Sequence, residues 1–249
     1  MSVVSWLRKY VAAIALVILP AIALLVVAGR TGIHAQNANS TSQNNNGAQD
    51  EKQMISIGLA VAPVPLNLAG KDKKDQDLVG LGSYIVNVTG DCNGCHSAGP
   101  ATEFLPNGNP YTRQVPNGPY TGVKQTNTQW YLGGGRDFGG FPAPTSPLHI
   151  ISRNLTPDRT GLPEGGHTLQ EFITIMRTGL DMDHLHPDCV GAPTSSCTPF
   201  PFDGTKLLIM RWPSFRDMTD RQLTAMYEYL SAVPCVQGAD PNEPPNRCQ

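Results

Sequence analysis

The segment Cys92-Asn93-Gly94-Cys95-His96 constrains the fold of this chain more than any other feature of its sequence. Its C-x-x-C-H spacing is the attachment signature of c-type haem. Two thiols three positions apart on a turning backbone can reach two vinyl groups at one edge of a porphyrin. The neighbouring imidazole is then directed at the iron. The motif therefore predicts one covalent haem c, attached through Cys92 and Cys95 and ligated by His96.

Other uses of a cysteine pair fit this segment less well. A thioredoxin-like C-x-x-C lies in a βαβ unit, which the sequence does not indicate. A zinc site needs a second ligand pair, and Cys189 with Cys197 are too widely spaced to supply it. A disulfide between Cys92 and Cys95 would leave His96 without a role.

The composition indicates a loop-rich domain that a cofactor has to complete. Among 249 residues there are 25 Gly and 22 Pro, nearly a fifth of the chain, which excludes a long helical bundle. Only 40% of the residues are hydrophobic, so the protein core is modest. We expect a small all-α domain with long Gly/Pro-rich loops around a covalent haem.

The first predicted helix leads into the motif. Asp77 can cap it, and its apolar residues fall on one face before a turn at Gly90. Gly80 and Gly82 would weaken this helix in isolation, but they allow another helix to approach closely. The core positions of this face are Leu78, Leu81 and Ile85.

Two capping boxes predict two later helices. Thr168 with Glu171 opens a helix that stops at Gly179, and Thr219 with Gln222 opens the last helix, which Pro234 ends. Between residues 97 and 150, repeated Pro-Asn-Gly and Gly-Gly punctuation predicts loops with a short hairpin. The inward positions of the two helices are Leu169, Phe172, Ile173, Met176, Leu223, Met226, Tyr227 and Leu230.

The sixth iron ligand is sought among methionines and histidines that follow the motif. Met210 lies in an apolar loop before the last helix, from which a thioether can reach the distal face of a haem. His184 or His186, in a polar loop, and an open distal site remain alternatives. The other candidates have simpler roles in packing, in a staple or on the surface: Met176, Met182, Met218, Met226, His149 and His167.

The chain divides into four predicted segments. Val11 to Ala28 is an apolar run of 18 residues after Arg8 and Lys9, about the length of a membrane span. It is either an uncleaved anchor or a signal peptide cut after Ala35, and both place the rest of the chain outside the cytoplasm. The segments are 1–35 (anchor or signal peptide), 36–74 (unstructured tether, then an extended stretch from Ile55 to Leu68), 75–234 (haem domain) and 235–249 (C-terminal tail).

Charge and the remaining cysteines fit an exported protein. Beyond residue 35 there are 15 basic and 20 acidic residues, a net charge of −5, so no basic surface attracts nucleic acid. Four cysteines outside the motif allow three disulfide pairings. Pairing between sequence neighbours, Cys189 with Cys197 and Cys235 with Cys248, is the simplest.

Four further segments resemble a known family in the order of their motifs. Leu81-Gly82-Ser83-Tyr84-Ile85-Val86 precedes the C-x-x-C-H motif, and Arg153-Asn154-Leu155-Thr156-Pro157-Asp158 is similar to an "N-x-T-P-D" segment. Met210-Arg211-Trp212-Pro213 is similar to an "M-P-W-P" loop, and an "L-T-x-x-Y-x-Y-L" helix follows. Over about residues 78–234 the chain resembles bacterial membrane-associated c-type cytochromes, including subunits of periplasmic alcohol, aldehyde and gluconate dehydrogenases. It departs from them at Arg211, usually proline, and in having one haem motif where they often have three.

The resemblance implies a class I cytochrome c fold with Cys92, Cys95, His96 and Met210 as haem attachments and ligands. The expected function is an electron carrier rather than an enzyme, tethered on the periplasmic side of the inner membrane. Its partners would be a dehydrogenase as donor and an oxidase or another cytochrome as acceptor. Two alternatives remain open: a haem subunit of a dehydrogenase complex, and a haem enzyme or gas sensor with an open distal site. Asn154 and Thr156 could bond near the haem rim or form a turn, and Arg153 or Trp212 could meet a propionate.

Overall fold

The computed structural model describes residues 36–113, 115–120, 122–140, 144–145, 149–182, 205–239, 241 and 243–249. The chain forms two compact units, Met1–Glu51 and Lys52–Gln249, which are described separately. The predicted span from Val11 to Ala28, the two histidines of the polar loop, and Cys189 with Cys197 lie outside the described residues. Within the described ranges, no helix is both long and apolar enough to cross a membrane.

The segment expected to be an unstructured tether contains a helix, α2 (Gln36–Val61). No proline interrupts residues 36–61, and apolar residues near its C-terminal end give the helix a face to bury. Ile55 is 8% exposed and belongs to the core. The extended stretch predicted from Ile55 is therefore wrong up to Val61, where α2 ends before Pro63.

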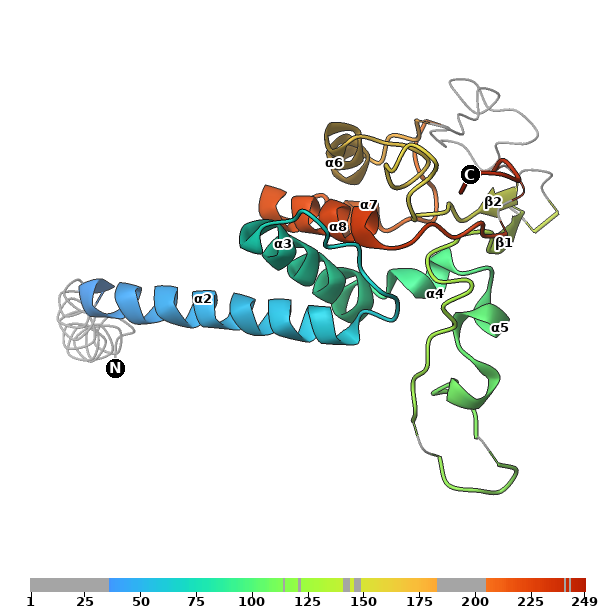
Figure 1. Ribbon diagram of the computed structural model, residues 1–249, viewed down its shortest axis with the longest axis horizontal. Coiled ribbons are helices and arrows are strands. Elements are labelled where there is room, and N and C mark those ends of the chain that lie inside the picture. The colour runs from blue at the N-terminus through green and yellow to red at the C-terminus, as the bar shows by residue number, and fades with distance from the viewer. Residues whose placement is uncertain are drawn as a thin grey trace, which may run out of the picture. The chain divides into compact units, whose positions relative to one another are not determined.

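Close packing of three helices forms one side of the second unit. α3 (Lys73–Tyr84) lies between the end of α2 and α8 (Asp220–Ala232) (Figure 1). A Cβ atom on Gly80 would lie 2.8 Å from the Ile55 carbonyl oxygen, and one on Gly82 would lie 1.8 Å from the Ala225 carbonyl oxygen. The prediction that these glycines admit a neighbouring helix is confirmed, with a different helix against each one.

The helix starts were predicted with mixed success. α3 begins four residues before the predicted cap, because Asp72 accepts a hydrogen bond from the Asp75 N–H and caps it, while Asp77 pairs with Lys73 inside the helix. Both capping boxes are confirmed, at Thr168 for α6 (Leu169–Thr178) and at Thr219 for α8. Gly179 ends α6 at a φ of 70°, as expected of a C-terminal glycine.

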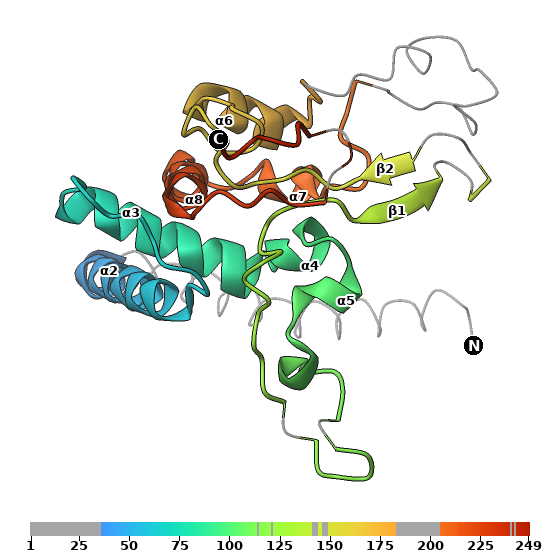
Figure 2. The same cartoon turned by 45° about the vertical axis from the view of Figure 1, so that its right-hand side comes forward.

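The long middle of the chain consists of loops with a few short elements. These include α5 (Pro100–Glu103), the 3₁₀ turn η2 (Pro106–Gly108) and α7 (Trp212–Phe215). The predicted hairpin is β1 (Asp137–Gly140) paired antiparallel with β2 (His149–Ile151) (Figure 2). The described residues are thus mainly helix and loop with one two-stranded sheet, and the cytochrome c fold class stays a prediction.

A buried hydrogen-bond cluster holds the loops to the helices. The Tyr131 hydroxyl lies 2.5 Å from Asn87 Oδ1 and 2.6 Å from the Tyr229 hydroxyl. Tyr131 and Tyr229 are at most 1% exposed. This cluster joins the loop before β1 to α8 and to η1 (Ile85–Thr89), the π-helical turn that continues α3.

The C-terminal tail is attached to the domain by a disulfide and a buried arginine. Cys235 and Cys248 are bonded, as predicted from their nearness in sequence. Arg247 is 1% exposed, donates hydrogen bonds to the Thr156 and Pro157 carbonyls, and pairs with Glu243 at 3.0 Å. The tail is therefore part of the packed structure around residues 154–157.

Candidate cofactor site

The C-x-x-C-H motif forms its own short helix, α4 (Cys92–His96), after a sharp change of direction. The π-helical turn η1 ends at Thr89 and is capped by Gly90. Asp91 follows with a φ of 45°, in the left-handed region that non-glycine residues seldom adopt. This reversal starts a new helix axis at Cys92. As a result, the motif lies on a helix with a different direction from that of α3.

Three hydrogen bonds fix α4 to the segment 132–136. The Leu132 N–H donates to Asn93 Oδ1 at 2.9 Å, and the Gly134 N–H donates to the His96 carbonyl at 2.7 Å. Arg136 donates to the Gly94 carbonyl. The two residues between the cysteines therefore hold the helix in place, a role that the spacing alone did not indicate.

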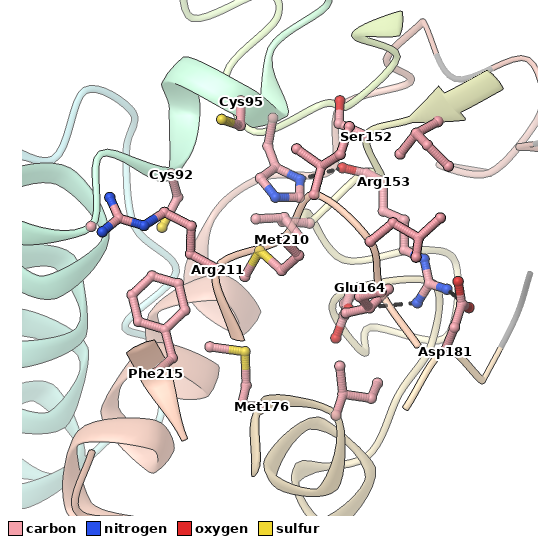
Figure 3. A pocket seen from close by; sticks show the side chains of 18 of the residues that line it. Cys92, Cys95, Ser152, Arg153, Glu164, Met176, Asp181, Met210, Arg211 and Phe215 are labelled. Atoms are coloured by element: carbon pink, nitrogen blue, oxygen red, sulfur yellow. Dashed lines mark hydrogen bonds and ion pairs between the residues drawn. The ribbon is translucent and has the colours of Figure 1, made fainter. Parts of the chain in front are cut away.

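All four residues predicted to hold the haem line one cavity of about 310 Å³. This volume falls within the range of about 300–1,000 Å³ that is typical of cofactor sites. Cys92 and Cys95 enter it from α4, and Met210 enters from the segment before α7 (Figure 3). Most of the surrounding wall is apolar and comes from α6, α8 and nearby loops: Leu155, Phe172, Ile175, Met176, Met226 and Leu230.

The two motif cysteines are free thiols rather than a disulfide. Cys92 is buried and Cys95 is exposed, so the pair lies at the margin of the cavity. Burial, with a smaller contribution from Asp91, raises the pKa of Cys92 to about 12. The thiol of Cys92 is therefore protonated and uncharged at neutral pH.

The His96 imidazole has a fixed orientation. Its Nδ1 lies 2.7 Å from the Arg153 carbonyl oxygen, which can only accept, so the proton is on Nδ1. Burial lowers the pKa of His96, which favours the neutral ring. Nε2 then carries the lone pair, the arrangement that metal-ligating histidines normally have.

Three methionines, not one, line the cavity: Met210, Met176 and Met226. Met210 is partly buried against the core, and Met176 is 2% exposed on α6 (Figure 3). The sequence assigned Met176 to the core stripe of its helix, and it does lie in the core. Its second role as cavity wall was missed, because helical periodicity marks the buried face without showing what that face covers.

A group of three buried charged residues forms one polar region of the cavity wall. Arg153 forms an ion pair with Asp181 and lies 3.7 Å, Nη1 to Oε1, from Glu164. Figure 3 shows these three residues together on one side of Met210, with Cys92 on the other side. The side chains of Glu164 and Asp181 are only 7% exposed. Sequence reasoning singled out Arg153 but neither carboxylate.

The remaining candidates have structural partners instead. Asn154 and Thr156 are fully buried, and they hydrogen-bond to each other and to Val236 of the C-terminal tail. Neither lines the cavity, so of the two expected roles the structure favours a turn over a haem-rim contact. Trp212 donates its indole N–H to the Leu207 carbonyl at 3.0 Å.

Among the residues that the structure describes, two further histidines lie outside the predicted ligand set. His149, on β2, pairs with Asp137 at 2.8 Å, although it also borders the cavity. His167 is buried at the start of α6, where its carbonyl accepts a hydrogen bond from Tyr227. Within the part of the chain that the structure describes, no three His, Cys, Asp or Glu side chains gather as ligands for a metal ion.

Comparison with protein-family models, with curated protein sequences and with solved structures finds no match for this chain.

Proposed function

We propose that this protein is an exported, membrane-tethered c-type cytochrome that carries single electrons through one covalent haem. The observation that carries the proposal is the convergence of Cys92, Cys95, His96 and Met210 on one largely apolar cavity. The motif and the methionine come from distant parts of the sequence, and the motif alone does not require them to meet.

The residues present fit a haem in their chemistry as well as their position. Two free thiols lie where thioether bonds are expected to form, beside an imidazole whose Nδ1 is already engaged. When bound, the haem supplies a one-electron couple, and a methionine ligand raises its potential. The apolar wall excludes water, which favours the less charged, reduced form. Histidine and methionine together would fill both axial positions, so no substrate would have access.

The proposed location rests on the apolar N-terminal run, and the proposed partners are those that the resemblance to membrane-associated c-type cytochromes implies. An anchored or released domain would lie on the periplasmic side of the inner membrane, taking electrons from a dehydrogenase and passing them to an oxidase or another cytochrome. Such encounters need only a small, transient interface. We place no nucleic acid among its partners.

The decisive experiment asks whether the cysteines of the motif attach a haem. The full chain is produced in a host with a c-type maturation system, and haem that survives denaturation is measured by the pyridine haemochrome spectrum. We expect one haem per chain, lost in the Cys92→Ala/Cys95→Ala variant. The matched Cys235→Ser/Cys248→Ser variant also removes two cysteines and should retain it.

Two outcomes would overturn the proposal. One is a colourless full chain after maturation, and the other is equal loss of haem in both cysteine variants.

Carbon monoxide added to the reduced protein tests the closed distal side. A rapid spectral shift would point to an open site and hence to a haem enzyme or gas sensor. Copurification with a catalytic flavoprotein or quinoprotein would identify a dehydrogenase subunit.

A further inference from the structure

Glu164 combines two features that folding alone would disfavour. Its side chain is 7% exposed, although a carboxylate is costly to bury. Its φ of 51° lies in the left-handed region, where a non-glycine residue is strained. It is followed by Gly165 and Gly166, residues suited to such a conformation. Glycine would therefore suit the backbone conformation at position 164 better than glutamate does.

The carboxylate of Glu164 lies in the cavity wall, where its charge can affect a group bound inside. Arg153 lies 3.7 Å from it and also pairs with Asp181, and all three residues line the cavity together with Met210 and His96. The backbone carbonyl of Arg153 accepts the His96 Nδ1 proton. One residue thus connects the proposed proximal ligand to two buried carboxylates.

We propose that Glu164 is an electrostatic determinant of the reduction potential of this site, and that it lowers the potential. This inference rests on the proposed haem function. Oxidation of the iron adds one positive charge inside the cavity, and a fixed negative charge in its wall stabilises that oxidised state. The effect is strong because the low-dielectric surroundings screen little of it.

The sign of the effect does not depend on the other charges that line the cavity. Arg153, Lys206 and Arg211 also border it, and their positive charges act in the opposite direction, whereas Asp91 and Asp181 act in the same direction as Glu164. Removing the carboxylate of Glu164 leaves them unchanged, so the potential must rise. Glu164 would therefore offset part of the increase that a methionine ligand and an apolar wall produce.

The test compares Glu164→Gln with Glu164→Gly and Glu228→Gln in the haem-loaded full chain. Glu164→Gln removes the charge and keeps the shape, while Glu164→Gly also removes the backbone strain and so guards against a folding failure. Glu228→Gln removes the same charge from an ion pair with Lys71 that does not line the cavity. The readouts are midpoint potential at neutral pH, absorption spectrum and thermal unfolding.

Both Glu164 variants should shift the ferrous-to-ferric ratio at fixed potential toward ferrous by on the order of tenfold, about 59 mV for a one-electron couple. Their spectra should still report the wild-type axial ligands, and Glu228→Gln should leave the potential unchanged. A shift absent from both Glu164 variants, or equally large in Glu228→Gln, would overturn this inference while the haem assignment stands. A wild-type chain without covalent haem would overturn the proposed function itself.

Discussion

The Nδ1–H group of His96 donates a hydrogen bond to the backbone carbonyl of Arg153, 57 residues further along the chain, with 2.7 Å between Nδ1 and the oxygen. That carbonyl is itself fixed from two sides. The next residues, Asn154 and Thr156, bond to the C-terminal tail, and the Arg153 side chain pairs with buried carboxylates. The orientation of the imidazole therefore depends on segments far from the motif.

Met210 and Met176, two of the three methionines that line the cavity, provide a matched pair for testing the proposed sixth ligand. Met210→Ala should abolish the spectral band of thioether-ligated ferric haem and lower the midpoint potential by more than about 59 mV, a tenfold change in ratio. Met176→Ala should keep the band but lower the free energy of unfolding by about 2–5 kcal/mol, because it removes a buried side chain. The reverse pattern in the two spectra would assign the ligand to Met176.

Arg247 should be a main support of the tail. Arg247→Ala removes a side chain that donates to the Thr156 and Pro157 carbonyls and leaves its partner Glu243, 18% exposed, without a counter-charge. We expect the free energy of unfolding to fall by about 3–5 kcal/mol. Arg216→Ala, whose side chain is 56% exposed, should change it by less than about 0.5 kcal/mol. Equal effects in denaturant unfolding would show that the buried arginine does not stabilise the fold.

What the sequence predicted well was local. The capping boxes at Thr168 and Thr219 and the stop at Gly179 depend on residues a few positions apart, and the bonded cysteines Cys235 and Cys248 are separated by 13 positions. The C-x-x-C-H motif is local too. Met210 was chosen by elimination among loop methionines, and its place in the cavity depends on tertiary packing.

What the sequence did not predict depends on distant contacts. Polar residues at the start of α2 indicated a tether, yet the helix continues without a break to Val61, and its apolar end packs on α3. Glu164 lies in a Pro-Glu-Gly-Gly turn, a context typical of the surface, yet the fold buries it beside Arg153. A strained dihedral angle leaves no sequence signal beyond the neighbouring glycines.

Helix packing supplies a third prediction. Gly82→Ala would place Cβ 1.8 Å from the Ala225 carbonyl oxygen, a backbone atom that cannot rotate away. We expect destabilisation of about 1–3 kcal/mol or more, because α3 and α8 must separate. In Gly47→Ala, the new methyl group meets nothing within 4 Å, and alanine is favoured in a helix. Denaturant unfolding should show a loss only for Gly82→Ala, and similar values would argue against the close crossing.

The tyrosine cluster predicts a loss of stability in alkali. Burial, followed by the proximity of the two hydroxyls, raises the pKa of Tyr131 well above its usual range, and burial raises that of Tyr229. Tyrosines in the unfolded chain titrate near about 10. Below that pH both states hold the phenolic protons, so this stabilisation is complete. As the pH rises toward the higher folded pKa values, the unfolded state loses protons first, and stability falls by up to about 1.4 kcal/mol per pH unit for each phenol.

Denaturant unfolding measured across alkaline pH should show this slope in the wild type and a reduced slope in Tyr131→Phe. Tyr131→Phe should also cost about 1–3 kcal/mol at neutral pH, since it removes a partner of Asn87 and Tyr229. Tyr111, which is 75% exposed, is the matched control, and Tyr111→Phe should leave both quantities unchanged. Identical alkaline slopes in the two variants would mean that the buried hydroxyls do not govern the response to pH.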